Sequence, residues 1–211
     1  MSMEASRAAA ADVYHWVKAA VLKGEFLAGE RLDPRGLAKK IGASPSTVHT
    51  VLGRLAAEHL LLSLPGEGFH MPFLTEDVLR SAYRWMYALS LTALDLAGDD
   101  PAHELQGPTP TSPLVDDDPD VLATERFFNS LAARTENHDV RIAMAQTNDR
   151  LHALRRLEKH VLPDRMAEID AMCGLLGRNE HDALRDALAC YRDRRLVHVP
   201  ELVRLRHRVR Q

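Results

Sequence analysis

The stretch that most constrains the fold is residues 28–73, AGERLDPRGLAKKIGASPSTVHTVLGRLAAEHLLLSLPGEGFHMPF. A short helix over Pro34–Ile41 is predicted to end at Gly42, because a left-handed residue commonly closes a helix and glycine adopts that conformation without strain. Ser44 is a typical helix cap, and the apolar residues after it fall at the spacing of one buried helical face. The pattern therefore predicts two helices joined by a tight turn.

A hairpin is predicted directly after the second helix. Leu60–Leu62 and Phe69–Phe73 are short strand-like runs, and the turn-forming residues 65–68 join them. Helix, turn, helix and hairpin together indicate a winged helix-turn-helix, in which the second helix enters a DNA major groove with the hairpin as a wing beside it.

This order of motifs resembles the DNA-binding head of GntR-type transcription regulators. Residues 13–24 stand where that family has an apolar helix, and residues 24–32, GEFLAGERL, match its "GEL.PGERL" pattern. Residues 37–44, LAKKIGAS, follow in register with "LA..LGVS", and residues 66–68, GEG, match the "GRG" of the wing. The resemblance covers about a third of the chain and implies a DNA-binding transcription regulator.

Candidate DNA contacts lie on both motif helices and on the wing. They are Arg35, Lys39, Lys40, Ser44, Ser46, Thr47, His49, Thr50, Arg54, Gly66 and Gly68. The hydroxyl and imidazole groups among them can donate to phosphates and base edges. Compared with the family pattern, Pro45 and His49 replace two recognition-helix arginines, and Glu67 replaces the arginine of the wing.

The charge of the DNA-binding head is nearly balanced. Residues 1–75 hold eight Lys or Arg and seven Asp or Glu, and DNA affinity depends strongly on neutralised phosphates. Two functions from different classes therefore remain open. One is a dimeric regulator, a ligand-responsive repressor on a palindromic operator in double-stranded DNA. The other is a non-catalytic scaffold that keeps the fold with weak or no specific DNA binding.

Composition agrees with a mostly helical protein. Aromatic residues make up only 5% of the chain against 45% hydrophobic residues, so Leu, Ala, Val and Met must build the core, which favours helices. No apolar run approaches the roughly 18 residues of a membrane span, and no signal pattern opens the chain. We expect a cytoplasmic protein with no membrane partner. The usual nucleophile, phosphate-loop and zinc-protease motifs do not occur, so we expect no enzyme.

The region after the wing is predicted to be an all-helical bundle. The expected domains are a winged helix-turn-helix over 1–74 and a helical effector-binding and dimerisation domain over 75–211, with a Pro/Asp-rich loop at 99–119. The expected helices run from Thr75 to Gly98 and over 120–134, 140–161, 164–176 and 180–196. Pro200 is expected to break the chain before a basic tail, which is either an extended arm or a disordered end: Arg204, Arg206, Arg208 and Arg210.

This second part is similar to the FCD domain of the FadR-like branch of the family. Residues 128–132, FNSLA, and 135–137, TEN, resemble its "D..FH..L…SGN" passage. That domain often holds a divalent metal on one Asp and three His. Those positions fall here on Glu125, Asn129, near Ile169 and on Tyr191, or on Cys190 in an alternative register. Transition metals require several converging imidazoles or thiolates, so we expect neither metal nor cofactor.

The same resemblance places an effector pocket in the bundle. Met86 and Ser90 replace an arginine and a glutamate that the branch carries there. The expected pocket is lined by Met86, Ser90, Glu125, Asn129, Ile169 and Tyr191. Being mostly uncharged, it suits an apolar or weakly polar effector, or else these residues simply pack the core. His152, His160 and His181 are expected to be exposed or half-buried.

Overall fold

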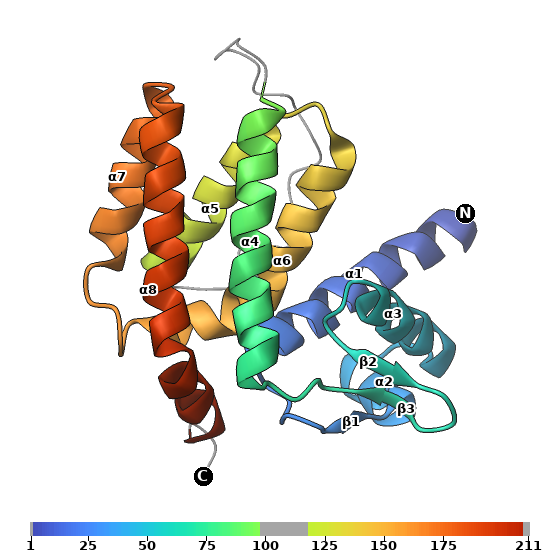
Figure 1. Ribbon diagram of the computed structural model, residues 1–211. Helices are drawn as coiled ribbons and strands as arrows, with labels where there is room; N and C mark the ends of the chain where they lie inside the picture. The colour runs from blue at the N-terminus through green and yellow to red at the C-terminus, as the bar shows by residue number, and fades with distance from the viewer. Residues whose placement is uncertain (1, 98–117, 209–211) are drawn as a thin grey trace. The chain divides into compact units, whose positions relative to one another are not determined.

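The computed structural model of the protein describes residues 2–97 and 118–208. They divide into two compact units, one ending at Phe73 and one beginning at Leu74. Both units are built mainly from helices (Figure 1). Within the described residues, none of the helices combines the length and the apolar character that crossing a membrane requires.

The N-terminal unit is a winged helix-turn-helix, as the sequence predicts. Its elements are α1 (Ser2–Leu22), β1 (Arg31–Leu32), α2 (Pro34–Ile41), α3 (Pro45–Ala57), β2 (Leu62–Leu64) and β3 (Gly68–His70). Helices α1 and α2 both pack against α3, and the three strands form an antiparallel sheet in the order β1-β3-β2. A separate apolar core fills this unit, with Val17, Val48, Leu52 and Leu55 fully buried.

The caps of the two motif helices explain why the turn between them is sharp. Asp33 accepts hydrogen bonds from the backbone N–H of Arg35 at 3.2 Å and of Gly36 at 2.8 Å, which starts α2. Gly42 has φ +68° and closes it. Ser44 Oγ then accepts the Thr47 N–H at 3.0 Å and starts α3. The predicted bounds of α2 are confirmed.

The wing differs from its prediction in two respects. Its strands are Leu62–Leu64 and Gly68–His70 rather than Leu60–Leu62 and Phe69–Phe73. The reason is that Leu60 and Leu61 are buried in the core directly after α3, so pairing begins only at Leu62. A third strand, β1, was not predicted; two residues are too short to show a period in sequence.

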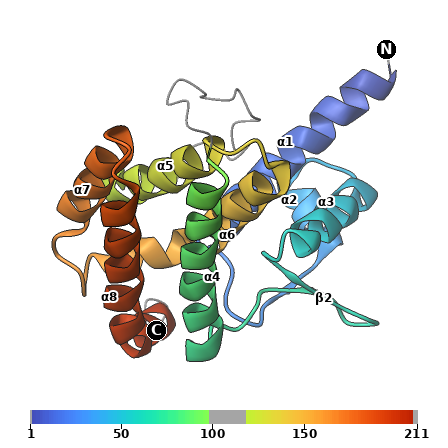
Figure 2. The same ribbon diagram turned by 45° about the horizontal axis from the view of Figure 1, so that its top comes forward.

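The C-terminal unit is an all-helical bundle, also as predicted. Its helices are α4 (Glu76–Asp95), α5 (Pro119–Ala133), α6 (His138–Glu158), α7 (Arg165–Gly177) and α8 (His181–Arg208). Helix α4 packs along α8 and also contacts α5 and α6, while α7 packs on α5 and α8 (Figures 1 and 2). The predicted loop at 99–119 lies outside the described residues up to 117, and Pro119 already belongs to α5.

The expectation that Pro200 ends the last helix is wrong, because α8 continues through it to Arg208. Proline has no N–H, so the carbonyl of Leu196, four residues earlier, loses its helical donor. Arg80 of α4 replaces that donor: its Nη1 donates to the Leu196 carbonyl oxygen at 2.9 Å. Arg204 and Arg206 consequently lie on a helix and do not form an extended arm, while Arg210 lies outside the described residues.

We predict that Arg80→Met destabilises the chain by about 1–2 kcal/mol. The Leu196 carbonyl would then have neither a backbone N–H from Pro200 nor the Arg80 guanidinium as a hydrogen-bond donor. In a Pro200→Ala background the backbone N–H returns, and the same change should cost clearly less. Arg84→Met, on the exposed side of the same helix, is the matched control. Urea unfolding of the four variants gives the coupling between the two sites; equal costs in both backgrounds would contradict this account.

Candidate functional site

Helix α3 presents one polar face to solvent. Ser44, Ser46, His49 and Thr50 are exposed, while Val48, Val51, Leu52 and Leu55 on the opposite face are buried. The hydroxyl groups bond mainly to one another and to the helix: Ser44 Oγ lies 2.9 Å from Ser46 Oγ and 2.7 Å from the half-buried Thr47 Oγ1. Thr50 Oγ1 donates to the Ser46 carbonyl at 3.1 Å. This face offers small polar groups with little charge.

His49 connects the exposed face of α3 to the sheet. Its ring meets the ring of Phe69 on β3 edge-on, with centroids 5.2 Å apart and an interplanar angle of 72°. Phe69 is itself buried. The orientation of the wing relative to α3 therefore depends in part on this contact.

Arg54, at the end of α3, is held inside its own domain. Its Nε donates to Glu58 Oε1 at 3.0 Å, and its guanidinium carbon lies 3.8 Å from the centroid of the Tyr14 ring on α1. The Tyr14 hydroxyl donates to Glu58 Oε2 at 2.8 Å. Burial raises the pKa of Tyr14, Lys18 opposes that shift, and Glu58 adds to it. Arg54 thus helps to hold α3 against α1. The sequence alone predicts Arg54 only as a DNA contact.

The remaining candidates lie on α2 and on the wing. Arg35, Lys39 and Lys40 are exposed, and Lys40 Nζ sits 5.1 Å from the ring centroid of Trp16. Gly66 in the hairpin turn and Gly68 at the start of β3 have φ of +76° and +88°, which explains why glycine occupies both positions.

In the helical unit, none of the four positions that the FCD resemblance aligns with metal ligands lies in a cluster of metal-binding side chains among the described residues. Glu125 Oε1 lies 2.9 Å from His152 Nδ1 and 3.4 Å from Arg155 Nη1. Asn129 Oδ1 accepts a hydrogen bond from Asn148 Nδ2 at 2.8 Å. Ile169 and Tyr191 are buried, whereas Cys190 is exposed, so Tyr191 is the one that faces the interior. No group of three metal-ligating side chains occurs among the described residues.

The other two expected pocket residues pack in the same core. Met86 and Ser90 on α4 are fully buried, and Ser90 Oγ donates back to the Met86 carbonyl at 2.8 Å. Met86, Ile169 and Tyr191 belong to one apolar cluster.

The expectation that His152 is exposed or half-buried is wrong. Its exposed fraction is 3%, because it lies on the face of α6 that packs against α5, one turn from the buried Asn148. Its link to Glu125 compensates part of the cost of burying a polar ring.

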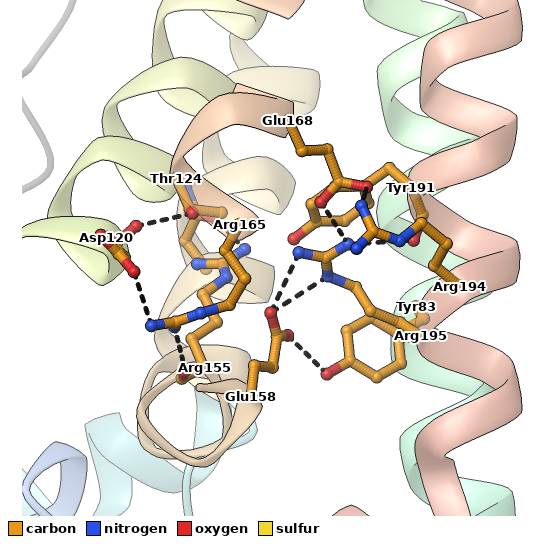
Figure 3. Close-up of polar contacts among 11 residues, drawn as sticks. Tyr83, Asp120, Thr124, Arg155, Glu158, Arg165, Glu168, Tyr191, Arg194 and Arg195 are labelled. Atoms are coloured by element: carbon orange, nitrogen blue, oxygen red, sulfur yellow. Dashed lines mark hydrogen bonds and ion pairs between the residues drawn. The ribbon is translucent and has the colours of Figure 1, made fainter. Parts of the chain in front are cut away.

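A network of buried charges crosses the bundle, and sequence reasoning missed it. Glu158 of α6 accepts the Tyr83 hydroxyl at 2.8 Å and Arg195 Nε at 3.1 Å (Figure 3). Arg195 Nη1 also donates to Glu168 of α7 at 2.8 Å, and Arg194 Nη1 reaches the same carboxylate at 2.9 Å. Glu158 and Arg195 are 2% and 0% exposed, so the network is part of the core.

The electrostatics of this network follow from burial and pairing. Burial, followed by the charge of Glu158, raises the pKa of Tyr83 well above its usual value, which keeps Tyr83 a neutral donor. Burial alone would lower the pKa of Arg195, but Glu158, then Tyr191 and Glu168, outweigh it and raise that pKa. Arg195 therefore remains charged within the core.

A second part of the network joins α5, α6 and α7. Arg155 Nη2 donates to Asn148 Oδ1 at 2.8 Å. Arg165 donates to the Arg155 carbonyl at 3.0 Å and to Asp120 Oδ2 at 2.6 Å (Figure 3). A sequence signal for these residues existed. Arg155 follows the buried Leu151 by four residues, so both lie on one helical face.

Several buried donors in this interior lack a hydrogen-bond acceptor, and Arg165 Nε is one of them. Arg155 Nε and the Tyr191 hydroxyl are buried and have no hydrogen-bond partner. Both side chains adjoin Phe128, whose ring centroid is 5.6 Å from the Arg155 guanidinium carbon and 5.2 Å from the Tyr191 centroid. Burial raises the pKa of Tyr191, so its hydroxyl stays neutral. Unsatisfied buried donors are costly and are candidates for ligand contacts.

We predict that Arg195→Met destabilises the chain by about 3–5 kcal/mol, because Glu158 would be left buried without its main counter-charge. The adjacent Arg194→Met is the control. It removes a guanidinium that binds the same Glu168, but at 34% side-chain exposure, so its cost should stay within about 1 kcal/mol. Urea titrations would measure both; similar losses for the two variants would show that burial of the pair does not matter.

Comparison with known proteins assigns the N-terminal unit. Residues 9–71 match the family of bacterial regulatory proteins named gntR, so this unit is a gntR-type winged helix-turn-helix domain. No curated protein matches the sequence.

Two solved structures share the fold over nearly the whole chain. The E. coli protein McbR/YncC is 18% identical with a TM-score of 0.62, covering 91% of this chain and 97% of that one. A protein from Rhodococcus sp. RHA1 described as a GntR transcriptional regulator is 15% identical with a TM-score of 0.67, covering 92% and 98%. At these identities, the likeness concerns the fold.

Proposed function

We propose that this protein is a DNA-binding transcription regulator of the gntR type, acting in the cytoplasm. The observation that carries the proposal is the exposed polar face of α3 beside a three-stranded wing, in a domain that matches the gntR family. In a helix-turn-helix protein the second helix enters the major groove. The side chains available there are Ser44, Ser46, Thr47, His49 and Thr50, with Arg35, Lys39 and Lys40 beside them on α2.

The active form in this proposal is a homodimer that represses from a palindromic operator. A single head offers few charged contacts, since Arg54 bonds to Glu58 and residues 1–75 are nearly balanced in charge. Two heads double the contacts, and a two-fold axis matches a palindromic site. The alternative is a scaffold that keeps the fold without operator binding.

Two substitutions separate phosphate contacts from base contacts. We predict that Glu67→Arg raises the affinity for all DNA sequences alike and steepens the salt dependence by roughly one to two per head, because it changes the wing by two charges. We expect His49→Ala to change the preference among sites instead. Fluorescence anisotropy on several duplexes over a range of salt measures both. DNA binding that is unchanged in both folded, dimeric variants would favour the scaffold.

We also propose that the helical unit is FadR-like and binds a small effector. The support comes from two of the buried donors without acceptors, the hydroxyl of the expected pocket residue Tyr191 and Arg155 Nε, whose guanidinium also pairs with Glu125. The charges of the network are balanced: four arginines, 155, 165, 194 and 195, face the acids 120, 125, 158 and 168. A weakly polar molecule with a hydrogen-bond acceptor fits such a site better than a strongly anionic one.

The effector site in this proposal works without a metal. Asn129, Ile169 and Tyr191 stand where three imidazoles would be needed, and Glu125 pairs with His152 and Arg155. We predict that elemental analysis of the purified protein finds no stoichiometric zinc, nickel or manganese. About one such ion per chain, lost in a Glu125→Ala variant, would contradict the prediction.

A further inference from the structure

Arg31 lies on the outer face of the wing and is not among the candidate DNA contacts predicted from the sequence. Arg31 lies on β1 directly opposite His70 on β3, and Gly68 is two residues from His70 on the same strand. Side chains of paired residues, and of residues two apart on a strand, lie on one face of a sheet. Leu32 and Phe69, the neighbouring pair, are buried on the opposite face. Arg31 therefore extends over the solvent side of the wing.

The guanidinium of Arg31 lies over Gly68. A Cβ placed at Gly68 would be 3.7 Å from Arg31 Nε and 3.8 Å from Nη2, so the flat head of the side chain rests on the glycine at ordinary contact distance. Gly68 has φ +88° and cannot easily be replaced by a residue with a side chain. Because Gly68 has no side chain, the Arg31 guanidinium can lie against the backbone next to the hairpin turn.

Arg31 also differs from Arg54 in what it contacts. Arg54 is bonded to Glu58 and stacked on Tyr14, whereas Arg31 is exposed and has no hydrogen bond or ion pair with any residue that the structure describes. An exposed guanidinium whose N–H donors are not used within the described residues is suited to bidentate binding of a phosphate.

The position of Arg31 is tied to that of the recognition helix. His49 of α3 packs against Phe69 on β3, between Gly68 and His70. When the exposed face of α3 approaches DNA, β3 and Arg31 on the adjacent strand β1 are also brought close to the duplex. This geometry gives the wing a cation at a position distant in sequence from Glu67.

We propose that Arg31 is the DNA-backbone contact of the wing, taking the place of the cation that Glu67 does not supply. This inference rests on the proposed DNA-binding function and adds a residue to it. The contact is to phosphate, so it contributes affinity and salt dependence rather than a choice of sequence.

The test compares Arg31→Gln with Lys23→Gln, which removes one exposed positive charge from the turn after α1 in the same unit. Arg31→Gln should weaken binding to unrelated duplexes by a similar factor, roughly tenfold per wing at low salt, and reduce the salt slope by about one per wing. Lys23→Gln should change both far less. Arg31→Lys, which keeps the charge, should retain most of the slope.

A double variant locates the contact. Because Glu67→Arg restores a cation at the wing, Arg31→Gln should cost less affinity and less salt slope in a Glu67→Arg background than in the wild type, so the two effects should not add. If the wild-type chain binds DNA but Arg31→Gln behaves like Lys23→Gln, or if the effects at 31 and 67 are additive, Arg31 is not the wing contact. If the wild-type chain binds no duplex at all, the proposed function itself fails, and this inference fails with it.

Discussion

The helical unit depends on one buried ion pair, between Arg195 of α8 and Glu158 of α6. Glu158 also accepts the Tyr83 hydroxyl from α4, and Arg195 also binds Glu168 of α7. Four helices therefore meet at two charged groups. Burying such charges is expensive unless each is paired and hydrogen-bonded. The arrangement consequently favours a single registration of the helices over any slipped packing of the same apolar faces.

A similar arrangement on a smaller scale organises the winged helix. Glu58, just after α3, accepts the Tyr14 hydroxyl from α1 and is paired with Lys18 and Arg54. This cluster fixes α3 against α1, but it also occupies the one arginine of the recognition helix. In the proposed regulator, DNA contact is then left to small polar groups on α3, to the cations of α2 and to Arg31 on the wing. A regulator of this kind would rely on shape, hydroxyl donors and dimerisation more than on charge.

The sequence predicted those helix ends that are set by residues at the ends themselves. Pro34, Gly42 and Ser44 set the ends of the two motif helices, and each acts through its own backbone conformation or cap. The end of α8 could not be predicted in this way, because Pro200 is tolerated only through Arg80, which is more than a hundred residues away in sequence. The charged core was missed for the same reason. The spacing of Arg155 from Leu151 places both on one helical face. The ion pairs and hydrogen bonds that allow His152, Arg155 and Arg195 to be buried come from other helices, and the spacing along one helix does not show them. Among the candidate DNA contacts, exposure follows from the helical period, whereas the pairing of Arg54 with Glu58 and Tyr14 had to be seen in three dimensions.

The proposed function requires the winged helix to recognise specific DNA. The most direct measurement is selection of genomic DNA fragments by the purified full-length protein at physiological salt, followed by sequencing. We expect the most enriched fragments to share an inverted repeat whose half-sites are separated by about one helical turn, as two symmetric recognition helices require. Enrichment without any common sequence, or no enrichment over input DNA, would contradict it.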